Sequence, residues 1–274
     1  MSVTLPYERL LITGAVGYLG GVLRRAMRDK GLRPRLTDIK APSYPLEGGE
    51  DFVTVDLARL DQVQAVVKDI DAIIHLGGHS IEGPWETILN ANIVGTYNLF
   101  EAARLACVKR IVFASSHHAV GYYRRERMID TRVPVRPDSR YAVSKVFGEA
   151  IGRLYADKHG MSVICQRIGI ARHRPPHQRA LRAWLSEDDF VRLTFDCLRA
   201  HDVHFEIVYG ISANDGAFWE NDGGRRIGYA PQDSACAFEK EILAQAAPDD
   251  AIEALFQGGK FTSAEFDGDP SKID

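Results

Sequence analysis

The feature that most constrains this chain is a glycine-rich loop near its start. Gly14, Gly17 and Gly20 lie in the sequence GAVGYLG, after an apolar run at 9–13 and before a segment with helical apolar spacing at 18–30. A chain with this order must turn sharply, expose bare backbone and begin a helix at once. Such a loop holds the pyrophosphate of a dinucleotide against the helix N-terminus. A tight turn without a ligand is the alternative for a single glycine motif.

The rest of the chain repeats the order of strand, turn and helix. We expect strands at 9–13, 33–38, 52–56, 72–76, 110–114, 162–167 and 205–209, and helices at 18–30, 60–68, 84–106, 139–159, 186–200 and 234–246. The strands are continuous apolar runs, which is typical of a parallel sheet covered on both faces. We therefore predict an α/β fold, a Rossmann-type doubly wound parallel sheet with a small C-terminal substrate-binding region.

Residues that follow the other strands extend the predicted nucleotide site. Asp38 ends the second strand, about twenty residues beyond the loop, where a carboxylate bonds the ribose hydroxyls of NAD and repels the 2′-phosphate of NADP. Lys40 keeps NADP as the alternative, and a turn residue is the other interpretation of Asp38. Asp56 ends the third strand, facing the adenine or solvent. Gly77 and Gly78 follow the fourth strand and either admit the cofactor or make a simple turn.

A tyrosine and a lysine provide the candidate chemistry. Tyr141 and Lys145 are four residues apart in the predicted helix at 139–159, so they share one face. Tyrosine, with a pKa of about 10, is a poor base at neutral pH, but a nearby ammonium lowers that pKa. Ser116 follows the fifth strand and is expected to bond the same substrate oxygen. Most tyrosine–lysine pairs at this spacing are ordinary helix surface, so the order of loop, serine and pair carries the prediction.

Composition excludes other classes of protein. Lys and Arg number 34 and Asp and Glu 37, a net charge of −3 that gives no basic footprint for nucleic acid or an anionic membrane. No apolar run approaches the ~18 residues of a membrane span, and the start lacks a secretory signal. The four cysteines form no CxxC pair, and the histidines at 75, 79, 117 and 118 lack ligand partners, so we expect no metal and a cytoplasmic location.

Several motifs resemble those of the extended short-chain dehydrogenases/reductases. They are TGAVGYLG at 13–20, the pair Asp56-Leu57, HLGG at 75–78 and YAVSK at 141–145. On this resemblance the expected NAD contacts also include Tyr18, Leu19, Leu57, Leu76, Tyr141 and Lys145, of which Lys145 holds the nicotinamide ribose. Asn92 of NIVGT would be the helix asparagine that supports the proton relay, and we count it with the cofactor residues. A packing asparagine is the alternative.

A narrower resemblance covers roughly residues 10 to 259. FASSHHAVGYY at 113–123, RIG at 167–169, WLSEDDFV at 184–191 and GISAND at 210–215 are similar to segments of uronate dehydrogenases and of archaeal-type NAD-dependent glucose-6-phosphate dehydrogenases. The resemblance implies that NAD oxidises C1 of a cyclic aldose with an anion at C6, giving the aldonolactone. It does not single out one sugar.

The same resemblance implies roles for individual residues. Ser116, Tyr141 and Lys145 match the catalytic residues, and Ser80, His118 and Arg179 match residues that hold the uronate. We also expect Ser116 and Tyr141 to contact the sugar.

Three positions depart from the usual pattern of these enzymes. Tyr18 stands in place of Gln, His117 in place of Asn, and Ile170 in place of a Ser that contacts the sugar. We keep His117 among the substrate residues. A pocket that loses a hydrogen bond loses its preference for the partner that needed it, so the substrate is affected more than the chemistry.

A basic segment follows the sixth strand. Residues 167–186 contain five arginines and no acidic residue, so the segment carries +5 and the rest of the chain −8. Either this is a solvated face or it is a pocket for a carboxylate, sulfonate or phosphate, which the arginine fork suits. Arg179 is the first candidate for that pocket and Arg174 the second.

These observations lead to one main hypothesis and its rivals. We expect an NAD-dependent sugar 1-dehydrogenase, a homo-oligomer acting on glucuronate or galacturonate, with sulfoquinovose and glucose 6-phosphate as alternatives. A nucleotide-sugar epimerase or dehydratase and a non-catalytic NAD-binding protein are the rivals. We expect a single domain over 1–274, with an NAD-binding Rossmann core at 8–166, substrate-binding elements at 167–261 and a loosely held tail at 262–274.

Overall fold

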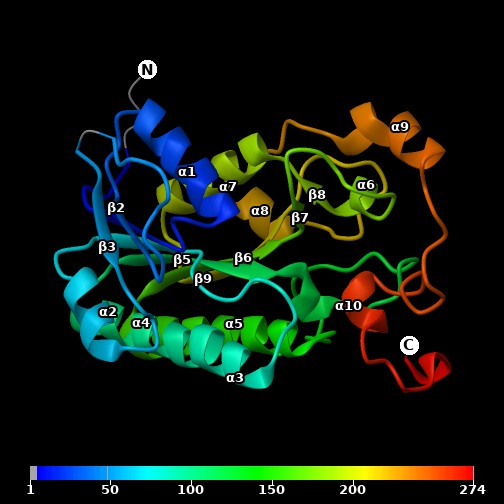
Figure 1. Ribbon diagram of the computed structural model, residues 1–274, viewed down its shortest axis with the longest axis horizontal. Helices are drawn as coiled ribbons and strands as arrows, with labels where there is room; N and C mark the ends of the chain where they lie inside the picture. Colours follow the sequence, from blue (N-terminus) through cyan, green and yellow to red (C-terminus); the bar gives the residue numbers. More distant parts are fainter. Residues whose placement is uncertain (1–4, 48, 274) are drawn as a thin grey trace.

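Seven parallel strands form the centre of the molecule. The computed structural model describes residues 5–47 and 49–273, and the strands lie in the order β3-β2-β1-β4-β5-β6-β9 (Figure 1). They are β1 Leu10–Thr13, β2 Arg35–Asp38, β3 Asp51–Thr54, β4 Ala72–His75, β5 Arg110–Ser116, β6 Ser162–Ile168 and β9 Phe205–Gly210. This order reverses beside β1, as in doubly wound sheets that bind dinucleotides. The predicted fold class is confirmed.

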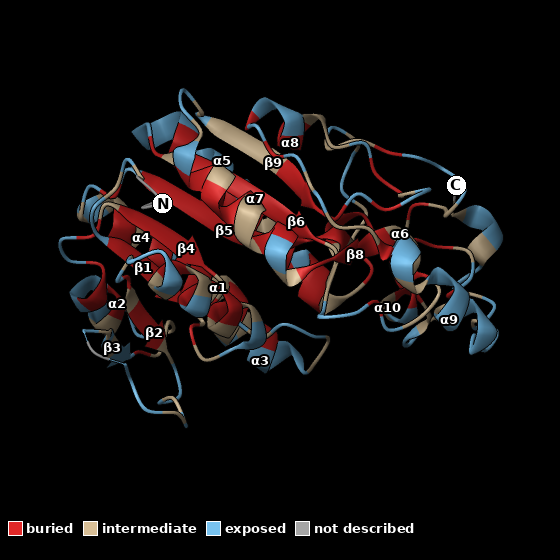
Figure 2. Ribbon diagram, turned by 90° about the horizontal axis from the view of Figure 1, so that it is seen from above, coloured by how far each residue is buried: buried red, intermediate tan, exposed pale blue. Residues whose placement is uncertain are grey.

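Helices cover both faces of the sheet, which explains the continuous apolar strands. Helices α1 (Tyr18–Asp29) and α7 (Glu187–Arg199) lie on one face, and α2 (Leu60–Val66), α4 (Gly95–Leu105) and α5 (Arg140–His159) lie on the other (Figure 1). Successive strand side chains point to opposite faces. Leu10 and Ile12 therefore join the core under α1, while Leu11 joins the core under α4. The central strands are buried along almost their whole length (Figure 2).

The helix predicted over 84–106 is continuous in space but changes its winding. It consists of α3 (Trp85–Ile88), a π-helical stretch (Leu89–Val94) and α4. A π-helical insertion is rare and often marks a functional site. It carries Asn92 at its middle. The helix predicted over 234–246 is likewise divided, into a 3-10 turn (Ala235–Phe238) and α9 (Glu239–Ala244).

The C-terminal third adds short elements around the carboxyl ends of β5, β6 and β9. Two short parallel strands, β7 (Ile170–Ala171) and β8 (Trp184–Leu185), form a second small sheet. Helices α6 (Ala180–Ala183), α8 (Asp222–Arg226) and α10 (Lys260–Ser263) and a 3-10 turn (Pro270–Lys272) complete the set. None of these short pieces was expected, because elements of two to five residues leave no periodic pattern.

The C-terminal segment is held against the body, in contrast to the loose tail expected over 262–274. The Arg124 guanidinium donates hydrogen bonds to the carbonyl oxygens of Pro270 and Ile273. The Tyr122 hydroxyl donates to the carbonyl oxygen of Thr262, which is itself fully buried. Composition misled here, because the polar side chains face solvent while the backbone is anchored. The last residue, Asp274, lies outside the described residues, as do 1–4 at the other end.

The helices carry no sign of a membrane segment. Within residues 5–47 and 49–273, no helix combines the length and the apolar character that a membrane span requires.

Candidate active site

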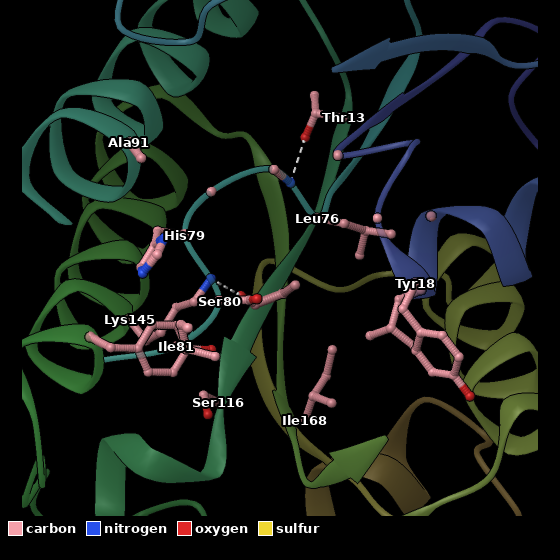
Figure 3. A pocket seen from close by; sticks show the side chains of 18 of the residues that line it. Thr13, Tyr18, Leu76, His79, Ser80, Ile81, Ala91, Ser116, Lys145 and Ile168 are labelled. Atoms are coloured by element: carbon pink, nitrogen blue, oxygen red, sulfur yellow. Dashed lines mark hydrogen bonds between the residues drawn. The ribbon is translucent and has the colours of Figure 1, made fainter. Parts of the chain in front are cut away.

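One large cavity opens at the carboxyl ends of the parallel strands. It has a volume of about 790 Å³ and is lined by the loops after β1, β2, β4 and β6, by the end of β5, and by residues of α5 and α10. In doubly wound sheets ligands bind at this edge, where the strand order reverses. Figure 3 shows Tyr18 on one side of the cavity and His79 and Lys145 on the other. The cavity therefore joins the glycine loop to the predicted chemistry.

The glycine loop has the shape that a dinucleotide requires. Gly14 has φ of +70°, and a Cβ atom there would lie 2.7 Å from the backbone nitrogen of Gly77. A Cβ atom on Gly20 would lie 2.2 Å from the carbonyl oxygen of Gly14. Gly17 is the N-cap of α1 and no side chain among the described residues caps this helix, so its first N–H groups can bind a ligand. The loop therefore fits a pyrophosphate placed against bare backbone.

The other expected cofactor residues surround the same end of the cavity. The lining includes Gly14, Gly17, Tyr18, Leu19, Gly20, Asp38, Asp56, Leu57, Leu76, Gly77 and Gly78. Asp38 accepts a hydrogen bond from the backbone N–H of Val16 at 3.0 Å, which fixes the carboxylate beside the loop. Lys40 lines the cavity as well. These residues fit the adenosine half of NAD.

Asn92 is the exception among the expected cofactor contacts. It stands behind the cavity wall, where its side chain accepts from the backbone N–H of His79 and donates to the carbonyl oxygen of the same residue. Its amide also donates to the Ser144 hydroxyl at 2.8 Å. Asn92 is therefore not among the residues that line the cavity, and its contact with the cofactor stays a prediction. Asn92 holds the loop that carries His79 and Ser80 against α5.

Ser116, Tyr141 and Lys145 meet at the centre of the cavity. Ser116 ends β5, while Tyr141 and Lys145 lie one turn apart on α5. The Ser116 hydroxyl oxygen accepts from the backbone N–H of His118 at 3.2 Å and hydrogen-bonds the Tyr141 side chain. The Lys145 ammonium donates to the carbonyl oxygen of Ala114 at 2.8 Å and lies 5.5 Å from the centre of the Tyr141 ring. The three residues that the sequence predicted to act together are therefore neighbours in the structure.

Burial dominates the pKa values of this group. It raises the pKa of Tyr141 to about 12, against the hydrogen bond from Ser116, which lowers it. It lowers the pKa of Lys145 to about 8. The sequence predicted that Lys145 depresses the pKa of Tyr141. In the structure, removal of both groups from water has the larger effect on their pKa values.

Arg179 is a buried cation that faces the same cavity. It is only 7% exposed, and the part of the chain that the structure describes gives it no carboxylate within ion-pair distance. Nη1 donates to the carbonyl oxygen of Gln257 at 2.8 Å and lies 3.5 Å from Nε2 of His117, while Nε has no partner among the described residues. Burial lowers its pKa to about 10, so it stays charged at neutral pH. A buried, unpaired guanidinium is poised for an anion.

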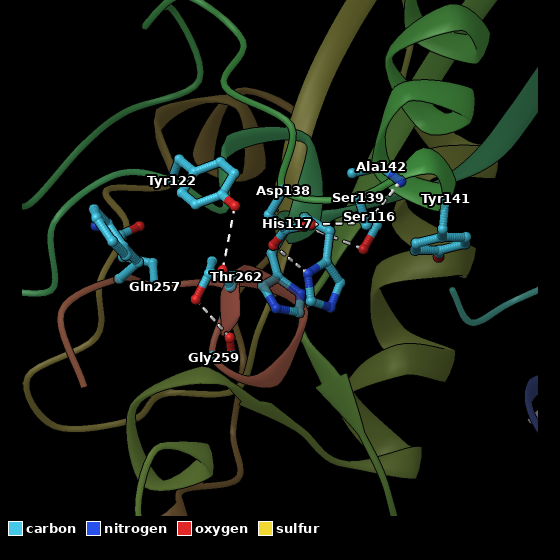
Figure 4. Close-up of polar contacts among 12 residues, drawn as sticks. Ser116, His117, Tyr122, Asp138, Ser139, Tyr141, Ala142, Gln257, Gly259 and Thr262 are labelled. Carbon is cyan, nitrogen blue, oxygen red and sulfur yellow. Dashed lines mark hydrogen bonds and ion pairs between the residues drawn. The ribbon is translucent and has the colours of Figure 1, made fainter. Parts of the chain in front are cut away.

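The two adjacent histidines line the cavity with different partners. Nδ1 of His117 bonds the carbonyl oxygen of Ile168 at 3.0 Å, and Nδ1 of His118 bonds the carboxylate of Asp138 at 2.6 Å. Burial lowers the pKa of His117 well below its usual value, so this ring is neutral. Figure 4 shows Ser116, His117, Asp138 and Tyr141 gathered at one end of the site. Ser80 lines the cavity too.

The basic segment does not form a pocket of five arginines. Arg174 is exposed, pairs with Glu241 of α9 and is not among the residues that line the cavity, so the structure does not bring it together with the other predicted substrate residues. The loop after β7 carries its side chain outward. Arg167 is buried in an ion pair with Glu149 at 2.8 Å. Arg172 and Arg179 are the two members of the segment that line the cavity.

Two residues near the reacting group escaped the sequence analysis. The ring of Phe261, on α10, stacks on His118 with centres 4.2 Å apart and meets Tyr141 edge-on at 6.1 Å. No motif surrounds Phe261 in the sequence. Asp138 stands three residues before Tyr141, and its side chain is fully buried. Its position just before the helix cap Ser139 was the one available signal.

Comparisons with known proteins agree with this geometry. Residues 10–170 match the model of the NAD dependent epimerase/dehydratase family. A uronate dehydrogenase from Pseudomonas syringae pv. tomato is 41% identical over 265 residues, 96% of each chain.

Two solved structures have the same fold at high identity. A glucuronic acid dehydrogenase from Chromohalobacter salexigens has a TM-score of 0.90 at 44% identity, covering 97% of this chain and 99% of that one. A mutant uronate dehydrogenase from Agrobacterium tumefaciens, complexed with NAD, has a TM-score of 0.89 at 43% identity, covering 93% of this chain and 97% of that one.

Proposed function

Because this chain belongs to the NAD dependent epimerase/dehydratase family and, within it, to the uronate dehydrogenases, we propose that it oxidises C1 of a cyclic hexuronate to the aldonolactone with NAD. Glucuronate and galacturonate are the proposed substrates. The observation that carries the proposal is Arg179, a buried cation without a carboxylate partner among the described residues, which lines the same cavity as Tyr141. A dehydrogenase for neutral sugars has no need of such a group.

The cofactor end of the cavity supports NAD over NADP. Gly14, Gly17 and Gly20 hold the pyrophosphate, and Asp38 bonds the ribose hydroxyls where a 2′-phosphate would be repelled. Lys145 holds the ribose of the nicotinamide. When bound, NAD accepts the hydride that leaves C1.

Tyr141 acts as the base in the proposed reaction. The proton of the C1 hydroxyl passes to the Tyr141 oxygen, while Ser116 bonds the same sugar oxygen and orients it. Because burial raises its pKa to about 12, Tyr141 needs added positive charge to serve as a base near neutral pH. The Lys145 ammonium and the positive nicotinamide ring supply that charge when the site is filled.

The sugar lies between the catalytic group and the arginine. Arg179 pairs with the C6 carboxylate, and Ser80 and His118, which line the same cavity, bond the sugar hydroxyls. His117 faces Arg179 through Nε2 and helps to orient it. Ile170, which also lines the cavity, offers the sugar no hydrogen bond. Recognition therefore rests more on the anion than on this side of the ring.

The test is NADH formation from a panel of sugars. We expect turnover with glucuronate and galacturonate, little with glucose, and much less with NADP than with NAD. Turnover of sulfoquinovose and of glucose 6-phosphate shows whether the cavity also accepts a sulfonate or a phosphate. The Tyr141→Phe variant is expected to lose ~10²–10⁴-fold in kcat. Equal turnover of glucose and of every anionic sugar would contradict the proposed anion site.

We further propose that the enzyme works in the cytoplasm as a homo-oligomer, built from an NAD-binding core at 8–166 and substrate-binding elements at 167–261. Cys107, Cys165, Cys197 and Cys236 are all free thiols, which suits a reducing compartment. Light scattering on the purified protein measures the oligomer.

A further inference from the structure

Asp138 is a buried carboxylate with a specific partner in the active site. Its side chain has no exposed surface, and its Oδ2 atom lies 2.6 Å from Nδ1 of His118. Oδ1 accepts a hydrogen bond from the Ser139 hydroxyl at 2.9 Å. Burying a charge is costly unless it is paired or hydrogen-bonded. The contacts with His118 and Ser139 therefore offset the cost of burying this carboxylate.

Two glycines make the space in which the carboxylate sits. A Cβ atom on Gly121 would lie 1.8 Å from Oδ2 of Asp138, and one on Gly258 would lie 2.0 Å from the same atom. Gly121 follows the turn after β5, while Gly258 comes from the C-terminal segment, and the two are joined by a hydrogen bond between N–H of Gly258 and the carbonyl oxygen of Gly121. The pocket around Oδ2 is thus closed by backbone on two sides.

The ring of His118 is fixed on its faces as well as at Nδ1. Phe261 stacks on it with ring centres 4.2 Å apart, and the His117 ring lies 4.1 Å away. Nε2 has no hydrogen-bond partner within the described residues, and His118 lines the cavity. The polar atom left for a substrate is therefore Nε2.

The carboxylate also selects the tautomer of this ring. An ionised carboxylate only accepts hydrogen bonds, so the proton of a neutral His118 must be on Nδ1. Nε2 then carries the lone pair, on a ring that lines the cavity.

We propose that Asp138 is a positioning residue of the reaction: it orients His118 so that Nε2 accepts a hydrogen bond from a hydroxyl of the sugar. The inference rests on the proposed uronate oxidation and adds a residue to it. Serine hydroxyls and arginine can supply donors to the substrate, whereas a neutral histidine in this tautomer supplies an acceptor.

The Asp138→Asn variant tests the tautomer directly. Asparagine keeps the shape, but its amide nitrogen donates to Nδ1 and moves the proton to Nε2. We expect the KM for glucuronate to rise about tenfold, the equivalent of one lost hydrogen bond, with kcat changed less and NAD affinity unchanged. Asp157→Asn is the matched control, because Asp157 bonds His204 at 2.8 Å on the exposed surface. It should leave KM, kcat and NAD affinity unchanged.

A double-variant cycle separates positioning from other effects of the charge. In a His118→Ala background, Asp138→Asn should change the KM by less than about twofold, because its effect acts through the ring. An equal effect in both backgrounds would overturn the proposal and assign the loss to the field of Asp138 on Arg179 or Tyr141. A KM for Asp138→Asn equal to that of the wild type would overturn it too.

Side-chain nitrogen NMR of the wild type gives an answer even if the variants fold poorly. We expect the His118 proton on Nδ1 in the complex with NADH and uronate, and a proton on Nε2 of the neutral ring would contradict us. Failure of the proposed function looks different. If the proposed function is wrong, the wild type itself forms no NADH from any uronate, and adding the sugar does not change the NMR signals of His118.

Discussion

Lys145 and Tyr141 lie one turn apart in the same cavity, and burial moves their pKa values in opposite directions. Burial lowers the pKa of Lys145 to about 8 and raises the pKa of Tyr141 to about 12. Each change favours the neutral form, as removal from water requires. Tyr141 is therefore neutral near neutral pH, whereas Lys145 keeps its charge there but loses it at a lower pH than an ordinary lysine.

The depressed pKa of Lys145 has a consequence for stability. Between pH 8 and the ordinary lysine value of 10.5, the unfolded chain binds one more proton than the folded chain, so the free energy of unfolding rises with pH in this window. Below pH 8 the folded state bears the full cost of charging the buried amine. We expect the Lys145→Met variant to be more stable than the wild type. This difference in the free energy of unfolding should be larger at pH 7 than at pH 10, by about 3 kcal/mol at most.

Chemical denaturation at the two pH values measures this difference. The variant also loses the hydrogen bond to Ala114, but that loss is similar at both pH values. A stability difference between variant and wild type that does not change with pH would show that Lys145 is not desolvated in the folded protein.

Single residues were predictable where a motif recorded their chemistry. Tyr141, Lys145 and the glycines are set by local spacing, so the sequence sufficed to place them. The position of Arg174 outside the cavity could not be predicted, because net charge along a segment says nothing of which side chains a loop turns inward. Phe261 reaches the site from 120 residues beyond Tyr141 through tertiary packing, which no local pattern records.

At the scale of elements, the turn from β1 into α1 carries the binding of the cofactor. The backbone of Gly20 lies close to the backbone of Gly14, since a Cβ atom on Gly20 would be 2.2 Å from the Gly14 carbonyl oxygen. Backbone cannot yield as a flexible side chain does. The loop and the start of the helix must therefore move apart if a side chain is added.

Gly20→Ala should separate this loop from its ligand. We expect NAD affinity to fall at least about tenfold and the melting temperature to fall, because the loop shifts away from the helix N-terminus. Gly21→Ala is the matched control one residue later, where a Cβ atom meets only Nη1 of Arg25 at 3.5 Å. That change should leave NAD binding intact and stabilise the helix by up to ~1 kcal/mol.

Titration with NAD, followed by protein fluorescence, compares the two alanines. Equal NAD affinity for Gly20→Ala and Gly21→Ala would mean that the tight loop is not part of the cofactor site.

Long elements with an apolar period were predictable from the sequence. The π-helical stretch around Asn92 was not, because its winding depends on what it packs against.

At the scale of the whole molecule, the chain closes its site with its own C-terminal segment. Arg140 links two parts of the wall: its guanidinium contacts Glu82 at 2.7 Å and makes two hydrogen bonds to Glu265 at 2.9 Å. Glu82 belongs to the loop that carries Ser80 and Ile81, and Glu265 follows Phe261 by four residues. Arg140 therefore ties the loop after β4 to the segment that bears Phe261.

Removing this link should make the loop after β4 and the segment that bears Phe261 more mobile, without changing the reacting groups. We expect Arg140→Gln to raise the KM for uronate a few-fold and to speed proteolysis near residue 265, with NAD affinity unchanged. The effect is modest because each exposed ion pair is weak. Arg132→Gln is the control, since Arg132 is exposed and pairs with Asp130 away from the cavity. Identical proteolysis of both variants would contradict the role of Arg140.

The distribution of charge over the molecule was predicted only in outline. The +5 segment at 167–186 does adjoin the site, yet ion pairs with Glu149 and Glu241 occupy two of its arginines. Of the other three arginines, Arg179 is the one that is buried, and it faces the cavity with no carboxylate partner in the described part of the chain. A single buried cation binds one anion more specifically than a diffuse basic surface does.

The ratio of kcat/KM for glucuronate to that for glucose tests this account most directly. The two sugars differ at C6, so the ratio reports the interaction with the anion. We expect a ratio of at least ~10² in the wild type, the scale of a charged hydrogen-bonded pair, collapsing toward about one in Arg179→Met. A ratio near one in the wild type, or a large ratio that survives in Arg179→Met, would contradict the claim that Arg179 selects an anionic sugar.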